Sequence, residues 1–95
     1  MTAEVELHSL LTAFKERMRI FHNGEDTNLS RMLESSEQAI FQIVGTTKNN
    51  PRVRELILER ARYAYNDQVE FFYQNFQGDL MALSLENYKS EEIDD

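Results

Sequence analysis

Apolar residues recur at intervals of three and four along most of the chain, which is the spacing of amphipathic helices. The first such pattern predicts a helix over about residues 4 to 19, and its apolar residues are Leu7, Leu10, Leu11, Phe14, Met18 and Phe21. The pair Asn23-Gly24 then predicts a turn. A second pattern predicts a helix over about residues 28 to 44, started by a cap from Asp26, Thr27 or Asn28 and closed by Gly45.

The strongest apolar pattern follows a polar loop. Asn50 is a suitable N-cap and Pro51 suits the first position of a helix. Because neither Gly nor Pro recurs before Gly78, the pattern predicts one long helix from Pro51 to about Phe76. Residues 79–95 fit either an extended segment or a short helix. We therefore predict an all-α fold, a small three-helix bundle with a long third helix, in which residues 1–78 form the domain and 79–95 an extended acidic C-terminal tail.

The predicted third helix is apolar on two faces. One face carries Val53, Ile57, Ala61, Ala64 and Phe71, and the other carries a second set of large side chains. Two short helices cover only one face, so the second needs either the chain's own Leu80 to Leu85 segment folded back or a neighbouring subunit. On the subunit interpretation, the predicted interface consists of Leu58, Tyr65, Val69, Phe72, Tyr73 and Phe76.

Charge disfavours nucleic-acid binding. The net charge is −7, and the residues from Asp79 onward include six acids and a single base, Lys89. A nucleic-acid platform requires basic side chains beside the aromatic residues, and the third helix has four arginines: Arg52, Arg54, Arg60 and Arg62. Several acids share that helix, however. An acidic chain lacks the excess of Lys and Arg that gives affinity for phosphate backbones.

No residue pattern predicts catalysis, a cofactor or a metal. The chain has no cysteine. His8 and His22 lie about 20 Å apart along the first predicted helix, so we expect each to be an ordinary hydrogen-bonded or solvated side chain. No catalytic or phosphate-binding motif occurs, and we expect the protein not to be an enzyme. Without a basic leader or an apolar run of about 20 residues, we also expect no membrane association and an intracellular site of synthesis.

Three segments in order resemble a known family. "LLTAFKERMRIF", "GEDTNLSRMLESSEQAIFQIVG" and "ELILERARYAYNDQVEFFYQNF" are similar to the successive helices of the phage head-tail connector, or adaptor, family. These are small helical DNA-packaging or head-completion proteins of tailed bacteriophages. The resemblance covers about residues 7 to 85 and includes Arg60-Ala61-Arg62-Tyr63 and Tyr65-Asn66-Asp67.

The resemblance implies a structural virion protein without catalytic residues. It implies a homo-oligomeric, dodecameric ring beneath the portal protein, which extends the DNA channel and docks a stopper or tail-completion protein after DNA packaging. Its location would be the virion neck after synthesis in the host cytoplasm, and DNA would pass through without sequence-specific binding. The resemblance also implies a portal-docking segment at the C-terminus, formed by Leu80, Met81, Leu83, Leu85 and Tyr88.

A second function class fits the same residues. An acidic helical interaction module, such as a regulator or an antitoxin-like protein, would cover one partner with its third helix. It would form a heterodimer and have no affinity for portals.

Overall fold

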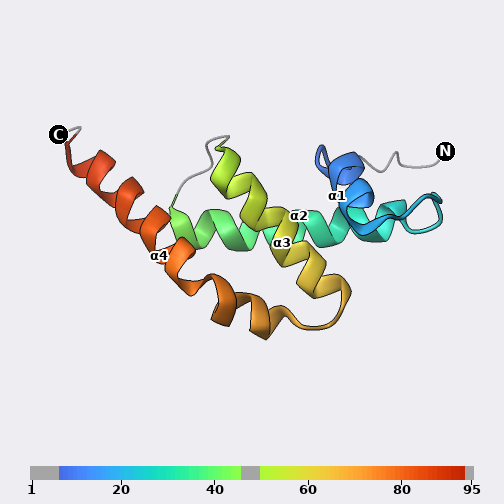
Figure 1. The fold of residues 1–95 in the computed structure, drawn as a ribbon. Helices are drawn as coiled ribbons and strands as arrows, with labels where there is room; N and C mark the ends of the chain where they lie inside the picture. Colours follow the sequence, from blue (N-terminus) through green and yellow to red (C-terminus); the bar gives the residue numbers. More distant parts are fainter. Residues whose placement is uncertain (1–6, 46–49, 94–95) are drawn as a thin grey trace.

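Four helices form the part of the chain that the computed structural model describes, namely residues 7–45 and 50–93 with side chains as far as Tyr88. They are α1 (Leu11–Met18), α2 (Asp26–Val44), α3 (Pro51–Tyr65) and α4 (Val69–Ile93), and these residues contain no strand (Figure 1). The all-α prediction is confirmed. The prediction of three helices is wrong, because the long third helix divides in two.

Helix α1 is shorter than predicted. The predicted segment of residues 4 to 19 lies partly outside the described residues, and the described stretch before Leu11 forms a turn, not a helix. In that turn the Leu11 amide donates to the His8 carbonyl and the His8 amide donates to the Ser30 hydroxyl. Helix α1 ends at Arg19, which adopts the left-handed conformation with φ 60°.

Helix α2 agrees with its prediction to within two residues at the start and ends at the predicted position. Gly45 follows Val44 with φ 77°, the conformation that closes helices most easily with glycine. The expected side-chain cap is absent at the N-terminus of α2, where Glu25 occupies the cap position without a side-chain hydrogen bond. Asp26 instead accepts a 2.7 Å contact from Lys15 Nζ, which ties the start of α2 to α1.

The start of α3 is as predicted, since the Asn50 side chain accepts a 2.8 Å hydrogen bond from the Arg52 amide and Pro51 opens the helix. Its end is not. The chain turns at residues 66–68, where Asp67 has φ 58° and the Gln68 amide donates to the Tyr63 carbonyl. Asn and Asp tolerate the left-handed region better than other non-glycine residues, so Asp67 permits a reversal without glycine.

Helix α4 corrects the prediction for the C-terminus. It continues through Gly78 to Ile93, so the segment that begins at residue 79 is helical and not an extended tail as far as the structure describes it. The helix bends at Phe76, whose φ of −114° and ψ of 15° are not helical. Its first half runs beside the body of the molecule, and its last turns project away from that body (Figure 1).

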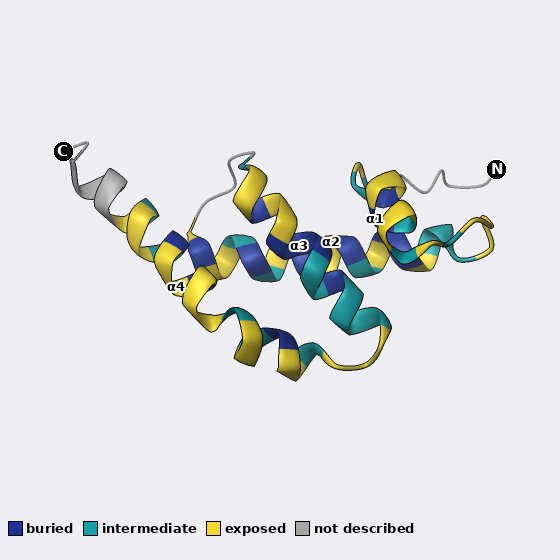
Figure 2. Cartoon of the chain, viewed as in Figure 1, coloured by how far each residue is buried: buried dark blue, intermediate teal, exposed yellow. Residues whose placement is uncertain are grey.

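The core lies where α3 packs between α2 and α4. Helix α4 contacts both α2 and α3, so the chain's own C-terminal half covers the second apolar face of α3. Phe72 is fully buried, and Leu80 and Leu83 are also buried (Figure 2). The Phe72 ring lies 5.0 Å from the Phe76 ring and 5.9 Å from the Tyr63 ring, centroid to centroid. An aromatic cluster therefore joins α3 to the start of α4.

Replacing Phe72 tests whether α4 belongs to the fold of the single chain. Phe72→Ala should lower the free energy of unfolding by about 3–5 kcal/mol, the usual cost of emptying a buried phenylalanine site. Its neighbour Phe71 is 46% exposed, so Phe71→Ala is the matched control and should cost under about 1 kcal/mol. Urea unfolding followed by circular dichroism measures both. Equal effects of the two substitutions would contradict the packing of α4 described above.

Candidate protein-interaction surface

The predicted subunit interface is divided between the core and the surface. Leu58 and Phe72 are buried in the chain's own core, so neither is available to a second copy while this fold is kept. The other four members are partly exposed: Tyr65, Val69, Tyr73 and Phe76. The six residues were grouped on one continuous helix, and the turn at residues 66–68 separates Leu58 and Tyr65 from the rest.

The predicted portal-docking set is divided by the faces of α4. Leu80 and Leu83 are buried and hold α4 against the body, whereas Met81, Leu85 and Tyr88 are 56%, 54% and 61% exposed. The exposed three are spaced four and three residues apart, so they lie on one side of a helix. We call them the α4 stripe. Exposed apolar side chains in a continuous row commonly mark a protein-binding surface.

An open groove of about 540 Å³ lies between the end of α2 and α4. We call it the α4 groove, and it is lined by Ile43, Tyr73, Gln74, Gln77, Leu80, Met81, Ser84 and Leu85. The lining contains no charged residue. Ile43 is 38% exposed there, although the sequence pattern assigns it to the apolar side of its helix together with Val44, which is buried.

Tyr73 forms a fixed part of the α4 groove. Its hydroxyl accepts a 2.9 Å hydrogen bond from Arg60 Nε, and Arg60 Nη1 donates to the fully buried Ser36 hydroxyl at 3.0 Å. The Arg60 guanidinium also lies 5.7 Å from the centre of the Tyr73 ring, within the range of a cation–π contact. Because Arg60 links α2, α3 and α4 in this way, the Tyr73 ring is held in place without a ligand.

A smaller pocket of about 370 Å³ lies on the other side of α4, against α3. Its lining combines apolar side chains with charges, and it consists of Pro51, Arg52, Glu55, Leu56, Glu59, Phe76, Asp79 and Leu83. Arg52 pairs with Glu86 of α4 at 3.0 Å, an exposed ion pair that joins α3 to α4. Such pairs contribute little stability, so we regard this contact as an aid to orientation.

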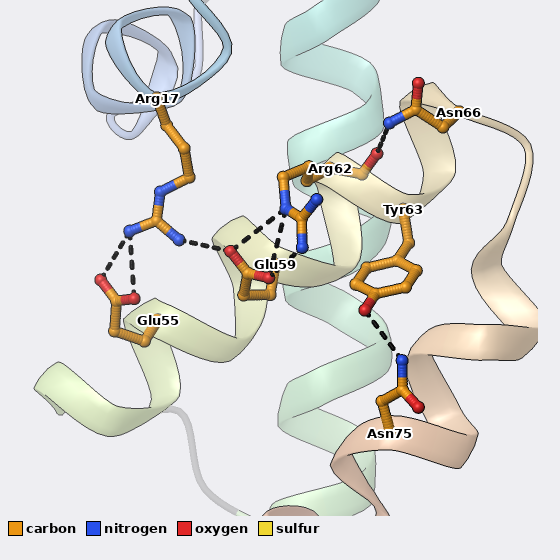
Figure 3. Close-up of polar contacts among 7 residues, drawn as sticks. All are labelled: Arg17, Glu55, Glu59, Arg62, Tyr63, Asn66 and Asn75. Carbon is orange, nitrogen blue, oxygen red and sulfur yellow. Dashed lines mark hydrogen bonds and ion pairs between the residues drawn. The ribbon is translucent and has the colours of Figure 1, made fainter.

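Figure 3 shows the charged network that joins α1 to α3. Arg17 contacts Glu55 at 2.8 Å and Glu59 at 2.7 Å, and Arg62 contacts Glu59 at 2.8 Å. Close by, the Asn66 side chain donates to the Arg62 carbonyl, and Asn75 of α4 donates to the Tyr63 hydroxyl. These contacts join the middle of α3 to α1 on one side and the last turn of α3 to α4 on the other.

The arginines considered for phosphate binding are mostly occupied within the chain. Arg52 and Arg62 pair with Glu86 and Glu59, and Arg60 donates to Tyr73 and Ser36. Phe72, one of the rings in the same stretch, is fully buried. These three arginines and Phe72 are therefore engaged in contacts within the chain.

The two histidines have different surroundings. His8 Nδ1 accepts from the Leu10 amide at 3.0 Å, and Nε2 lies 3.1 Å from Glu37, so the proton of a neutral ring belongs on Nε2. His22 is exposed and lies 3.7 Å from Glu25. Among the described residues no three His, Asp or Glu side chains come together as a metal site would require.

No protein-family model, curated protein or solved structure matches this chain. Within residues 7–45 and 50–93, no helix combines the length and the apolar character needed to cross a bilayer.

Glu59 makes the network sensitive to acid. Burial alone would raise the pKa of this carboxyl, but hydrogen bonds from Arg62 and Arg17 outweigh that effect and lower it below its ordinary value of 4.5. Since the folded pKa is the lower one, the stabilisation is complete above the unfolded pKa and is lost as the pH falls through the folded value.

Glu59→Gln should therefore lower the urea midpoint at pH 7 and reduce the loss of stability between neutral pH and the acid range below 4.5. The matched control is Glu34→Gln, because Glu34 is exposed on α2 and makes no ion pair within the described residues. Urea unfolding at a series of pH values measures both. A Glu59→Gln profile parallel to that of the unmodified chain would contradict the role of Glu59.

Proposed function

We propose that this protein is a phage head-tail adaptor, a structural subunit that forms a ring beneath the portal and docks a stopper or tail-completion protein. The resemblance of residues 7 to 85 to that family motivates the proposal. The exposed α4 stripe, on the part of α4 that Leu80 and Leu83 hold against the body, is the observation that carries it.

The α4 stripe is suited to binding a large partner. Leu80 and Leu83 anchor it to the body, so the position of Met81, Leu85 and Tyr88 is fixed by the fold of the chain. A preformed apolar row loses less conformational freedom on binding than a flexible tail does. In the proposed adaptor, Tyr88, the member of this row outside the α4 groove, contacts the portal protein, and the rest of the body contacts neighbouring copies.

The charge distribution supports the use of the ring as a DNA conduit. With a net charge of −7, a ring of such chains repels the duplex and does not retain it. The internal pairing of Arg52, Arg60 and Arg62 also leaves fewer cations for phosphate contacts. DNA would pass such a ring without sequence-specific binding.

The test is co-sedimentation of the purified full chain with DNA-filled, portal-bearing heads of the phage that encodes it. We expect saturation at a fixed copy number close to that of the portal. Tyr88→Asp should weaken binding at least about tenfold, because an interface tyrosine at a hot spot carries about 2 kcal/mol or more. Phe71→Asp, which changes an exposed aromatic residue near the start of the same helix, is the control and should bind normally.

Circular dichroism must first establish that both variants remain folded. Absence of binding by the unmodified chain would remove the adaptor function and favour the alternative, an acidic helical interaction module. Equal binding by the unmodified chain and Tyr88→Asp would keep the adaptor function but exclude Tyr88 from the portal contact.

A further inference from the structure

Phe21 is the most exposed of the large apolar side chains in the described part of the chain, at 87%. Its exposure is imposed by the turn between α1 and α2. Arg19 closes α1 with a positive φ, and Ile20 then packs against the core, so the next residue faces outward. Lys15 Nζ donates to the Asn23 side chain at 2.9 Å, and the Gly24 amide donates to His22 Nδ1 at 3.1 Å. We call residues 20–24 the Phe21 turn.

The α4 groove lies at the opposite end of the same helix. Phe21 precedes the first residue of α2, whereas Ile43, which lines the groove, is in the last turn of α2. Helix α2 has 19 residues, so the two sites are separated by about 28 Å along its axis. The Phe21 turn cannot fill the groove of its own chain.

We propose that the Phe21 turn of one copy inserts its ring into the α4 groove of a second copy. This proposal rests on the proposed function and deepens it by identifying the contact between neighbouring subunits. Because the two surfaces differ and lie at opposite ends of the molecule, the contact is heterologous and can be repeated from copy to copy. Such contacts close into rings when the rotation between subunits allows it.

The groove has the chemistry that a phenylalanine ring requires. Ile43, Leu80 and Met81 provide apolar contacts, and thioether sulfur packs favourably on aromatic rings. Tyr73 offers a second ring, and its hydrogen bond from Arg60 fixes it before the partner arrives. The groove volume of about 540 Å³ leaves room for one aromatic side chain together with the neighbouring residues of the turn.

Charge favours the head-to-tail arrangement over a symmetric pairing of two groove ends. From Asp79 onward the sequence has six acids and one base, Lys89. Arg19 is exposed beside the Phe21 turn and makes no ion pair within the described residues. Two α4 stripes brought face to face would place two acidic segments together, whereas the Phe21 turn brings the exposed Arg19 to the acidic segment.

A disulfide trap tests the contact directly, because the native chain has no cysteine. His22→Cys lies beside Phe21, and Gln77→Cys lies on the groove. A chain with both substitutions should form a ladder of disulfide-linked oligomers when it is oxidised at millimolar concentration. The pair His22→Cys and Phe71→Cys is the control, since Phe71 is exposed on α4 but does not line the groove. Adding Phe21→Ala to the first pair should reduce the crosslinked fraction about tenfold.

Complementary variants test the heterologous character of the contact. Phe21→Asp retains the groove, and Ile43→Asp retains the Phe21 turn, so each alone should be monomeric in sedimentation velocity. Mixed together they should form a heterodimer that cannot grow further. If circular dichroism shows Ile43→Asp to be unfolded, Met81→Glu, at a 56% exposed groove position, replaces it.

The proposal is overturned if the groove pair crosslinks no more than the control pair, if Phe21→Ala leaves the ladder unchanged, or if the mixed variants stay monomeric. The head-binding assay separates this result from the proposed function. A Phe21-dependent ladder without binding to heads would keep the contact and reject the adaptor function. Normal saturation of heads by Phe21→Asp, with no ladder, would reject the contact and keep the adaptor function.

Discussion

The third helix has large apolar side chains on two sides, and a chain of 95 residues has to cover both. Helices α1 and α2 cover one side, and the other is covered only because the chain reverses after Tyr65. The left-handed Asp67 makes that reversal possible in three residues. Once the chain has turned, Phe72 enters the core and the direction of α4 is set. Both the groove and the exposed stripe follow from this single turn.

The position of the turn explains which parts of the fold were predictable. Asn50, Pro51 and Gly45 act through their own backbone preferences, so the sequence indicates the end of α2 and the start of α3 correctly. Asn66 and Asp67 tolerate both a helix and a turn, and the apolar spacing continues across them. The choice is made by tertiary packing, because a continuous helix would leave Phe72 in water. The apolar periodicity of one segment carries no information about the stability gained when Phe72 is buried against other helices.

The same cause limited the prediction of the interaction surface. A helical wheel drawn through residues 51–76 placed Leu58 and Phe72 beside residues that the turn moves elsewhere. For the C-terminal residues, the set from Leu80 to Tyr88 was correctly recognised as apolar, but only the helical period separates Leu80 and Leu83, which are buried, from the α4 stripe. Ile43 and Phe21 were counted with the apolar sides of their helices. Their exposure depends on where α4 lies and on the conformation of Arg19.

Polar contacts determine how the four helices are oriented, whereas apolar burial determines that they associate. Arg17 bridges α1 to two glutamates of α3, and Arg60 reaches from α3 to α2 and α4. These arginines are used inside the chain, which removes much of the positive charge from its surface. In the proposed assembly, the acidic α4 with its apolar stripe would repel the same helix of a second copy. It therefore favours contacts with surfaces of different composition, which is the condition for an assembly built from two unlike sites on each subunit.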